Sequence, residues 1–227
     1  MPADDKQFAI VTIDGPERNL LNPALMAQIV ADLNIADGDP EVSGIIVTGA
    51  GTDFCGGLDL ASIRAGGDPI EFAGSLATLL KVFPRLTKPV VAAVNGDAVA
   101  SGSSIVAACD YAVSVPTAKI GSYEVGVGVW PMVAQVPLIH RLGARRAMEN
   151  IGCGEPFTAQ RSLEVGLVNR ITEPAELYAA VREWLTLAAR AGAASAGRVS
   201  FYEIAELNYD DALDAALEKF AAQFRNK

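Results

Sequence analysis

The stretch KPVVAAVNGDAVASGSSIVAACD, from Lys88 to Asp110, decides the fold. Its first part, Val90 to Val94, is a short β-branched run that predicts a buried strand of a parallel sheet. A turn from Gly96 to Gly102 follows, where glycines allow the backbone to approach a ligand. The apolar run from Gly102 to Ala108 then predicts a short helix. This order is typical of an α/β protein, in which ligand sites collect at the carboxyl ends of strands.

Further strands and helices are predicted on both sides of that stretch. Phe8 to Ile13 and Gly44 to Thr48 are predicted strands, and Asn22 followed by Pro23 marks the start of a helix. Tyr111 to Val115 is a further buried strand. Apolar spacing predicts helices over Pro69 to Leu86, Pro131 to Arg141, Ala144 to Ile151, Thr158 to Val165, Pro174 to Ala191 and Asp210 to Phe224.

The order of these elements predicts an α/β core over residues 1–171, followed by a helical region over residues 172–227 that packs on the core. The small-residue stretch from Gly192 to Gly197 is expected to separate the last two helices. With 227 residues, of which 51% are hydrophobic and 20% charged, the chain is expected to fold throughout.

The charge of the chain limits its partners. The formal net charge is −9 and there is no block of lysine and arginine, which argues against nucleic-acid binding because neutralising phosphates needs a basic surface. An anionic ligand would need local cations instead. The candidates close to glycine-rich segments are Arg18, Arg64, Lys88 and Lys119.

Cysteine and histidine usage bears on compartment and metals. Cys55, Cys109 and Cys153 are widely spaced and odd in number, which indicates free thiols in a reducing compartment. A single histidine, His140, leaves too few soft ligands for a zinc site. Met1 to Gln7 is acidic where a signal peptide is basic, and no apolar run reaches membrane-spanning length. We therefore expect a cytoplasmic protein without a metal.

One carboxylate stands out beside two glycine-rich turns. Glu124 lies in the run from Ser122 to Gly128, and the turns are Phe54 to Leu60 and Gly96 to Gly102. A carboxylate between two sets of backbone N–H donors could move a proton while a thioester oxygen carries negative charge. The arrangement predicts enolate chemistry.

Two other kinds of site are weighed against this one. The run from Gly49 to Gly51 starts like a dinucleotide fingerprint, but the third glycine and the later acidic residue are missing. The serines of Ala100 to Ser104 raise the possibility of a serine hydrolase, yet only His140 could be its base. Both sites are disfavoured.

Five segments occur in collinear order between Phe8 and Ile171, and they carry a resemblance: Asn19 to Asn22, Gly44 to Leu60, Lys88 to Asp110, Lys119 to Gly128 and Gly152 to Ile171. Together they resemble the crotonase, or enoyl-CoA hydratase/isomerase, superfamily. The resemblance implies a crotonase-like superhelical core of repeated ββα turns, trimers or pairs of trimers, and an acyl-CoA substrate of fatty acid metabolism. Coenzyme A enters only as part of that substrate, and no other cofactor is implied.

The resemblance also implies roles for individual residues. The main-chain N–H groups of Leu58 and Ser101 would form the oxyanion hole, and Glu124 would be the catalytic acid and base. CoA would lie along Arg18 to Leu20 and the Gly56 to Leu60 turn. The substrate-binding candidates are Arg18, Leu20, Gly56, Gly57, Asp59, Leu60, Ser104 and Trp130.

The chain departs from the family at three points. Ser104 stands where hydratases carry a second glutamate, Ser101 stands where glycine is usual, and fewer helices follow Asn169 than is normal. A single carboxylate is sufficient to move a proton from C2 to C4, whereas adding water needs a second acid or base. The sequence therefore favours a 3-enoyl-CoA to 2-enoyl-CoA isomerase. A hydratase or lyase that recruits Asp59 or a water held by Ser104, and a non-catalytic acyl-CoA-binding paralogue, remain the alternatives.

Overall fold

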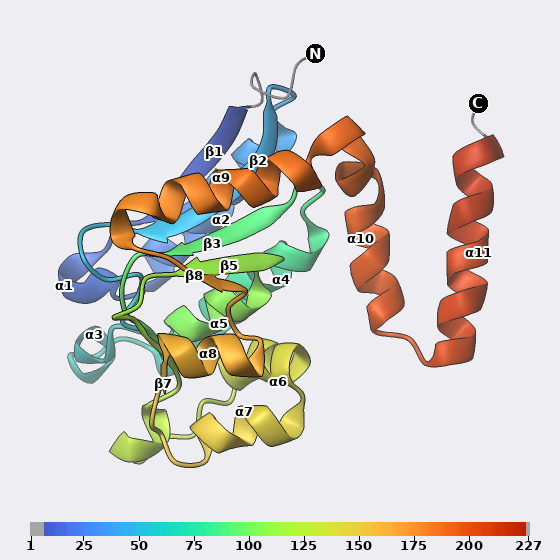
Figure 1. Ribbon diagram of the computed structural model, residues 1–227. Coiled ribbons are helices and arrows are strands. Elements are labelled where there is room, and N and C mark those ends of the chain that lie inside the picture. Colours follow the sequence, from blue (N-terminus) through green and yellow to red (C-terminus); the bar gives the residue numbers. More distant parts are fainter. Residues whose placement is uncertain (1–6, 226–227) are drawn as a thin grey trace.

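The protein is described by a computed structural model covering residues 7–225, built around a five-stranded sheet (Figure 1). Neighbouring strands of this sheet are parallel, in the order β1-β2-β3-β5-β8. Except for Gln7, the Met1 to Gln7 segment discussed above lies outside the described residues. The strands are β1 (Gln7–Ile13), β2 (Val42–Gly49), β3 (Val90–Val94), β5 (Tyr111–Ser114) and β8 (Arg170–Ile171).

A second, smaller sheet was not predicted, because its strands are only two or three residues long. It consists of β4 (Ala98–Val99), β6 (Lys119–Gly121) and β7 (Phe157–Thr158), with β6 parallel to β4 and antiparallel to β7. An isolated bridge from Cys55 to Ala98 connects the first glycine-rich turn to this sheet, and a second bridge, from Leu21 to Leu58, connects the turn to the segment before α2. The small sheet therefore brings together the segments on which the predicted site depends.

Helices cover the large sheet, which explains why β3 is buried along its whole length. Helix α2 (Pro23–Gly38) packs on β1 and β2, and begins where the Asn22 side chain accepts a hydrogen bond from the Leu25 N–H at 2.9 Å. Helix α9 (Leu177–Ala188) crosses in front of the strands in Figure 1. Its Trp184 ring stacks on Tyr111 of β5 at a centroid distance of 4.8 Å.

The remaining helices connect the strands or surround the small sheet. Most are short. Their bounds are α1 (Pro16–Asn19), α3 (Leu60–Arg64), α4 (Pro69–Val82), η2 (Phe83–Arg85), α5 (Ser101–Ala108), η3 (Glu124–Val127), α6 (Gln135–Leu142), α7 (Ala144–Ile151), α8 (Ala159–Val165), η4 (Pro174–Glu176) and η5 (Arg190–Gly192). No helix between residues 7 and 225 is long and apolar enough to cross a membrane.

The C-terminal helices correct two predictions. The Gly192 to Gly197 stretch does not separate two helices, because α10 (Ala193–Ala205) begins inside it and α11 (Tyr209–Arg225) follows a short turn. Alanine is the best helix former, and three alanines outweigh the glycines here. Of the C-terminal helices α9, α10 and α11, α9 is the one that packs on the sheet. Helices α10 and α11 form a hairpin that stands away from the core (Figure 1), and we call residues 193–225 the α10–α11 arm.

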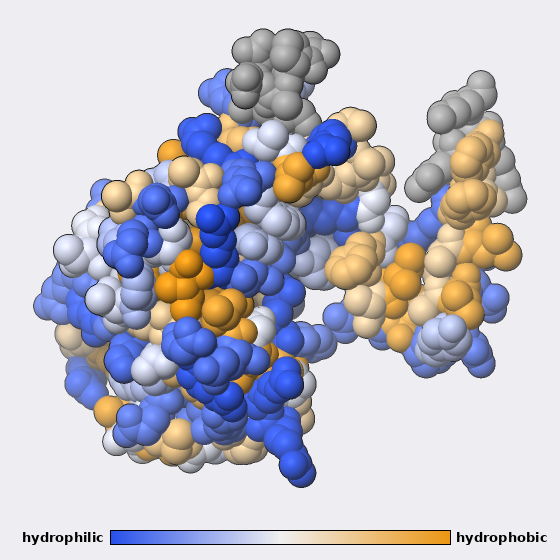
Figure 2. All heavy atoms as spheres, in the orientation of Figure 1, coloured by the Kyte–Doolittle hydropathy of each residue, from blue (hydrophilic) through white to orange (hydrophobic). Residues whose placement is uncertain are grey.

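A buried ion pair attaches this arm to the core. The Arg198 guanidinium binds both carboxylate oxygens of Asp110, at 2.7 and 2.9 Å, and donates to the main-chain oxygens of Phe83 and Leu86. The Tyr202 hydroxyl also donates to Asp110. Figure 2 shows apolar side chains gathered along the arm. The exposed ones include Phe201, Leu213, Leu217, Phe220 and Phe224.

Candidate active site

A cavity of about 210 Å³ lies between the start of α3, helix α4, the start of α5, η3 and the loop into α6. Its lining brings together Leu58, Ser101 and Glu124, three residues predicted to carry the chemistry. Apolar side chains make up most of the rest. The other lining residues are Leu60, Ala73, Leu76, Ala100, Tyr123, Val129, Trp130, Pro131, Met132, Val133 and Ala134.

Two main-chain N–H groups are available at this cavity. Leu21 donates to the Gly57 oxygen at 2.8 Å and accepts from the Asp59 N–H at 2.9 Å, which secures the turn on both sides of Leu58. Within residues 7–225, neither the Leu58 nor the Ser101 N–H donates to a protein acceptor. Ser101 is also the first residue of α5, where the helix dipole is positive. The pair is therefore suited to hold a negatively charged oxygen.

Each of these donors follows a residue with a positive φ. Gly57 has φ 97° and Ala100 has φ 50° with ψ −125°, a conformation that alanine adopts at a cost of about 1–3 kcal/mol. The two turns touch at these residues, because a Cβ on Gly57 would lie 2.7 Å from the Ala100 Cβ. Only glycine fits at position 57. The contact brings the two turns that carry the donors together.

Cys55 packs beneath both turns. A Cβ on Gly102 would lie 2.3 Å from the Cys55 oxygen, so α5 approaches this residue as closely as glycine permits. The Cys55 sulfur accepts the Gly57 N–H at 3.5 Å. Burial raises the pKa of the Cys55 thiol to about 12, which keeps it neutral at physiological pH. Cys55 is therefore a packing residue and not a nucleophile.

Glu124 belongs to the same lining and is the first residue of η3. Its Oε2 accepts the Ser122 hydroxyl at 2.5 Å and the Tyr123 N–H at 2.9 Å. Its Oε1 accepts no hydrogen bond from the described residues. One carboxylate oxygen is therefore held in place, while the other is available to exchange a proton with a substrate.

Asn150 of α7 holds the segment that carries Glu124, a role that sequence reasoning missed. Its Oδ1 accepts the Ser122 N–H at 2.6 Å, and its Nδ2 donates to the main-chain oxygens of Ser122 and Glu155, both at 2.8 Å. Asn150 and Ser122 are 28 positions apart. No local sequence signal indicates this contact, which depends on how α7 packs on the small sheet.

Tyr123 is a polar residue of the cavity lining that was not predicted. The side chain of Tyr123 is half-buried. This burial raises the pKa of its phenol, and the adjacent Glu124 charge makes a smaller contribution in the same direction. The phenol is therefore a hydrogen-bond donor at neutral pH. Among the described residues that line the cavity, Tyr123 and Glu124 are the ionisable ones.

The residues expected to bind CoA lie beside the first glycine-rich turn. A Cβ on Gly56 would lie 3.1 Å from both Arg18 Cβ and Leu20 Cδ2, and the Gly56 N–H donates to the Arg18 oxygen at 2.8 Å. The Arg18 guanidinium is already paired with Asp53 and Asp97, each at 2.8 Å. These two carboxylates neutralise the charge that was expected to meet an anionic ligand.

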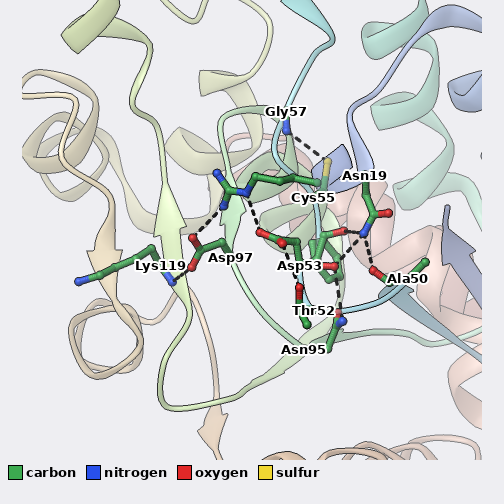
Figure 3. A network of polar contacts seen from close by, with 11 residues as sticks. Asn19, Ala50, Thr52, Asp53, Cys55, Gly57, Asn95, Asp97 and Lys119 are labelled. Atoms are coloured by element: carbon green, nitrogen blue, oxygen red, sulfur yellow. Dashed lines mark hydrogen bonds and ion pairs between the residues drawn. The ribbon is translucent and has the colours of Figure 1, made fainter. Parts of the chain in front are cut away.

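A network of amide side chains supports this region (Figure 3). Asn19 donates to the main-chain oxygens of Ala50 and Asp53, at 2.9 and 2.8 Å, and Asn95 donates to those of Gly49 and Gly51.

The other expected cations do not line the cavity formed by the described residues. Lys88 is buried and donates to the main-chain oxygens that end α2. Arg64 and Lys119 are exposed.

Two candidates for a second polar group at the site are engaged elsewhere. The Ser104 hydroxyl is fully buried and donates to the Ala134 oxygen at 2.6 Å. Asp59 caps α3 and accepts both the N–H and the hydroxyl of Ser62, whose hydrogen bonds lower the pKa of the Asp59 carboxyl. Neither residue is part of the cavity lining formed by the described chain.

The serine-hydrolase pattern is not assembled either. His140 is on the surface of α6, with its Nδ1 3.5 Å from Glu206, and does not line the cavity formed by residues 7–225. The Ser103 hydroxyl donates to the Ala100 oxygen at 2.7 Å.

No group of three His, Cys, Asp or Glu side chains within the described residues could hold a metal ion.

Comparison with known proteins adds an independent line of evidence. Residues 4–225 match the profile of the enoyl-CoA hydratase/isomerase family. A putative enoyl-CoA hydratase of Thermus thermophilus is 35% identical over 173 residues, which cover 73% of this chain and 68% of that protein. A short-chain-enoyl-CoA hydratase of Clostridium acetobutylicum is 34% identical over 185 residues, covering 78% and 70%. The crystal structure of an enoyl-CoA hydratase of Mycobacterium smegmatis superposes with a TM-score of 0.90 at 26% identity, covering 97% of this chain and 88% of that one.

Proposed function

Since the chain belongs to the enoyl-CoA hydratase/isomerase family, we propose that it stabilises the enolate of an acyl-CoA thioester and shifts a 3-enoyl-CoA double bond to the 2-position. The observation that carries this proposal is the composition of the cavity. Two unpaired main-chain N–H groups, of Leu58 and Ser101, share it with Glu124. Glu124 is the one carboxylate among the described lining residues.

The proposed reaction uses these three groups in sequence. The thioester oxygen accepts hydrogen bonds from the Leu58 and Ser101 N–H groups, and the free Oε1 of Glu124 removes a proton from C2. The electron pair of the broken C–H bond moves into a dienolate, whose negative oxygen the two donors stabilise. Glu124 then returns the proton to C4, and the double bond forms between C2 and C3. Each such donor contributes about 10²–10³ in rate.

The surroundings support binding of the rest of the substrate along the first turn. We propose that the pantetheine lies along the surface formed by Arg18 to Leu20 and Gly56 to Leu60, because these two backbones are in close contact and leave no space between them. Arg18 would contribute hydrogen-bond donors at a fixed position more than a positive charge, because the carboxylates of Asp53 and Asp97 offset that charge. Coenzyme A is part of the substrate in this proposal, and no separate cofactor takes part.

Hydration is the second candidate reaction, because the relatives from Thermus thermophilus and Clostridium acetobutylicum are named as enoyl-CoA hydratases. Adding water needs a group that binds the water and a group that protonates C2. Ser104 and Asp59 are committed to Ala134 and Ser62. Tyr123 is the remaining ionisable side chain of the described lining, so a hydratase would depend on it.

Assembly and compartment belong to the same proposal. The resemblance implies trimers or pairs of trimers, and the exposed apolar side chains of the α10–α11 arm support association through that arm. Three free thiols, two of them buried, support a reducing compartment such as the cytoplasm.

The test is an NMR assay in D2O with 3-enoyl-CoA and 2-enoyl-CoA thioesters, which follows double-bond position, 3-hydroxyacyl product and deuterium at C2 and C4. Migration with exchange and without hydroxyacyl product is expected. Glu124→Gln should lower turnover about 10²–10⁴-fold and leave acyl-CoA binding intact. The exposed Glu41→Gln is the matched control and should behave like the parent chain.

The other outcomes identify the alternatives. Hydroxyacyl product that disappears in Tyr123→Phe would make the protein a hydratase. Acyl-CoA binding without exchange at C2, at any chain length, would leave a non-catalytic binding protein. Turnover retained by Glu124→Gln would contradict the assignment of Glu124 as the acid and base.

A further inference from the structure

One wall of the cavity is both apolar and open to solvent. Val129, Trp130 and Met132 line the cavity, yet they are 51%, 42% and 70% exposed. We call these three residues the apolar rim. The cavity itself, at about 210 Å³, is smaller than the roughly 300–1,000 Å³ of most small-molecule sites. A ligand that fills the cavity and has further apolar atoms would extend over the apolar rim.

Trp130 does not lie loosely on this rim. Its indole Nε1 donates to Gln135 Oε1 at 3.0 Å, and Gln135 Nε2 donates back to the Met132 oxygen at 3.3 Å. Gln135 is the first residue of α6, so the indole is tied to a helix terminus. The hydrogen bond leaves the ring face available, because it uses the edge of the indole.

The chemistry of the rim selects one kind of occupant. Its three side chains carry no charge, and the only polar group among them, the indole N–H, is already satisfied by Gln135. Met132 is a flexible thioether that adapts to irregular apolar shapes. Such a surface, continuous with the cavity that holds Glu124, fits the distal carbons of an unbranched acyl chain.

We propose that Trp130, held by Gln135, determines acyl-chain specificity, and that the substrates are thioesters whose acyl chain is long enough to leave the cavity and lie over the apolar rim. The proposal rests on the proposed function, since it places the thioester at Leu58 and Ser101. Trp130 contacts the substrate directly. Gln135 is a positioning residue that acts through Trp130.

The first experiment measures kcat/KM for unbranched enoyl-CoA substrates of four to twelve carbons. For chains that pass the cavity, each added methylene should raise kcat/KM about twofold in the parent protein, since a half-covered methylene gains part of the full burial energy. Trp130→Ala should remove this gain, so that kcat/KM falls progressively more as the acyl chain becomes longer. A parallel fall at every chain length would overturn the proposal.

The positioning role of Gln135 has its own controls. Gln135→Ala removes the acceptor of the indole N–H and should reduce the preference for long chains, mainly through KM. Gln135→Glu keeps an acceptor oxygen at the same reach and should restore most of the preference. Gln160→Ala removes an exposed glutamine of α8 that contacts Glu164, and should change nothing. Equal profiles for all three variants would overturn the role of Gln135.

A second measurement does not depend on turnover. The chain has two tryptophans, so the emission of Trp130 is the difference between the parent protein and Trp130→Phe. Saturated acyl-CoA thioesters should shift this emission to shorter wavelength, increasingly with chain length, while CoA alone should not. Such a shift without turnover would support the rim and contradict the isomerase. Turnover with a chain-independent emission would contradict the rim alone, and absence of acyl-CoA binding at every length would contradict both.

Discussion

The floor of the cavity and the α10–α11 arm use apolar contact differently. We use the word floor for the contact between the two glycine-rich turns, where a Cβ added at Gly57 would overlap Ala100 and a Cβ added at Gly102 would overlap Cys55. In the arm, large side chains such as Phe220 and Leu217 stay more than half exposed, and attachment to the core depends on the polar side chain of Arg198. The floor is complete within one chain, whereas the arm has a surface that a further chain could cover.

The largest effect is expected from disturbing the floor. Gly57→Ala places a Cβ at 2.7 Å from the Ala100 Cβ, at a φ of 97° that alanine rarely adopts. The turn must shift, so the Leu58 and Ser101 donors should separate and kcat/KM should fall about 10²-fold or more. Gly74→Ala in α4 is the control, because a Cβ there meets nothing within 4 Å. It should retain activity and raise the helix stability by about 0.5–1 kcal/mol. Equal activities in an enoyl-CoA assay would contradict the coupling of the two turns.

The second effect concerns the attachment of the arm. Arg198→Ala leaves the Asp110 carboxylate, which is 14% exposed, without its ion-pair partner, and breaking a buried pair typically costs about 3–5 kcal/mol. Denaturant unfolding should show this loss of stability. The exposed pair between Arg170 and Glu183 gives the comparison, since Arg170→Ala should produce no resolvable change. A similar result for both variants would mean that burial of the Arg198 pair does not determine how the arm is held.

The third effect is a pH dependence at the same attachment. Burial, followed by the Asp110 charge, raises the pKa of Tyr202 to about 12 from the model-compound value of 10.0. The folded state therefore holds this proton more tightly than the unfolded state, so its stabilising contribution is present below pH 10 and is lost as the pH rises toward 12. Denaturation midpoints measured across this range should fall less steeply for Tyr202→Phe than for the parent protein. Identical slopes would contradict this prediction.

The smallest effect on the core is expected on α11 of the arm. Phe220 is 59% exposed, so the charge that Phe220→Glu introduces should not change the stability of the core measurably. If a further copy covers this surface, the same substitution should reduce the mass seen by analytical ultracentrifugation. Lys219→Gln is the neighbouring control, because Lys219 pairs with Glu203 within the arm. An unchanged mass for Phe220→Glu would exclude this part of the arm from the interface.

Local signals in the sequence predicted those parts of the fold that depend on local periodicity. The bounds of β3 and α7 agree with the sequence pattern, because a β-branched run and an amphipathic repeat determine them. Helix α6 starts at Gln135 and not at Pro131, since the preceding residues line the cavity and Ala134 accepts the Ser104 hydroxyl. The small sheet and the α10 start were missed because long-range pairing and alanine propensity determine them.

The sequence predicted which turns and which carboxylate meet at the candidate site, but it did not predict the side-chain contacts that hold them. The glycine turns and Glu124 meet at one cavity, as the order of motifs indicates. The positioning contact of Asn150 with Ser122 joins α7 to the residue after β6, across 28 positions, and has no local signature. The pairing of Arg18 with two aspartates was equally hidden, because it depends on segments 35 and 79 residues away.

The asymmetry of the Glu124 carboxylate has a stereochemical consequence. One oxygen is anchored by Ser122 and Tyr123, so a single oxygen on one side of the cavity would take hydrogen from C2 and return it to C4. In the proposed isomerisation, removal and return then occur on the same face of the substrate. A fraction of the original hydrogen should be delivered before solvent replaces it, which gives less than one deuterium at C4 per turnover in D2O.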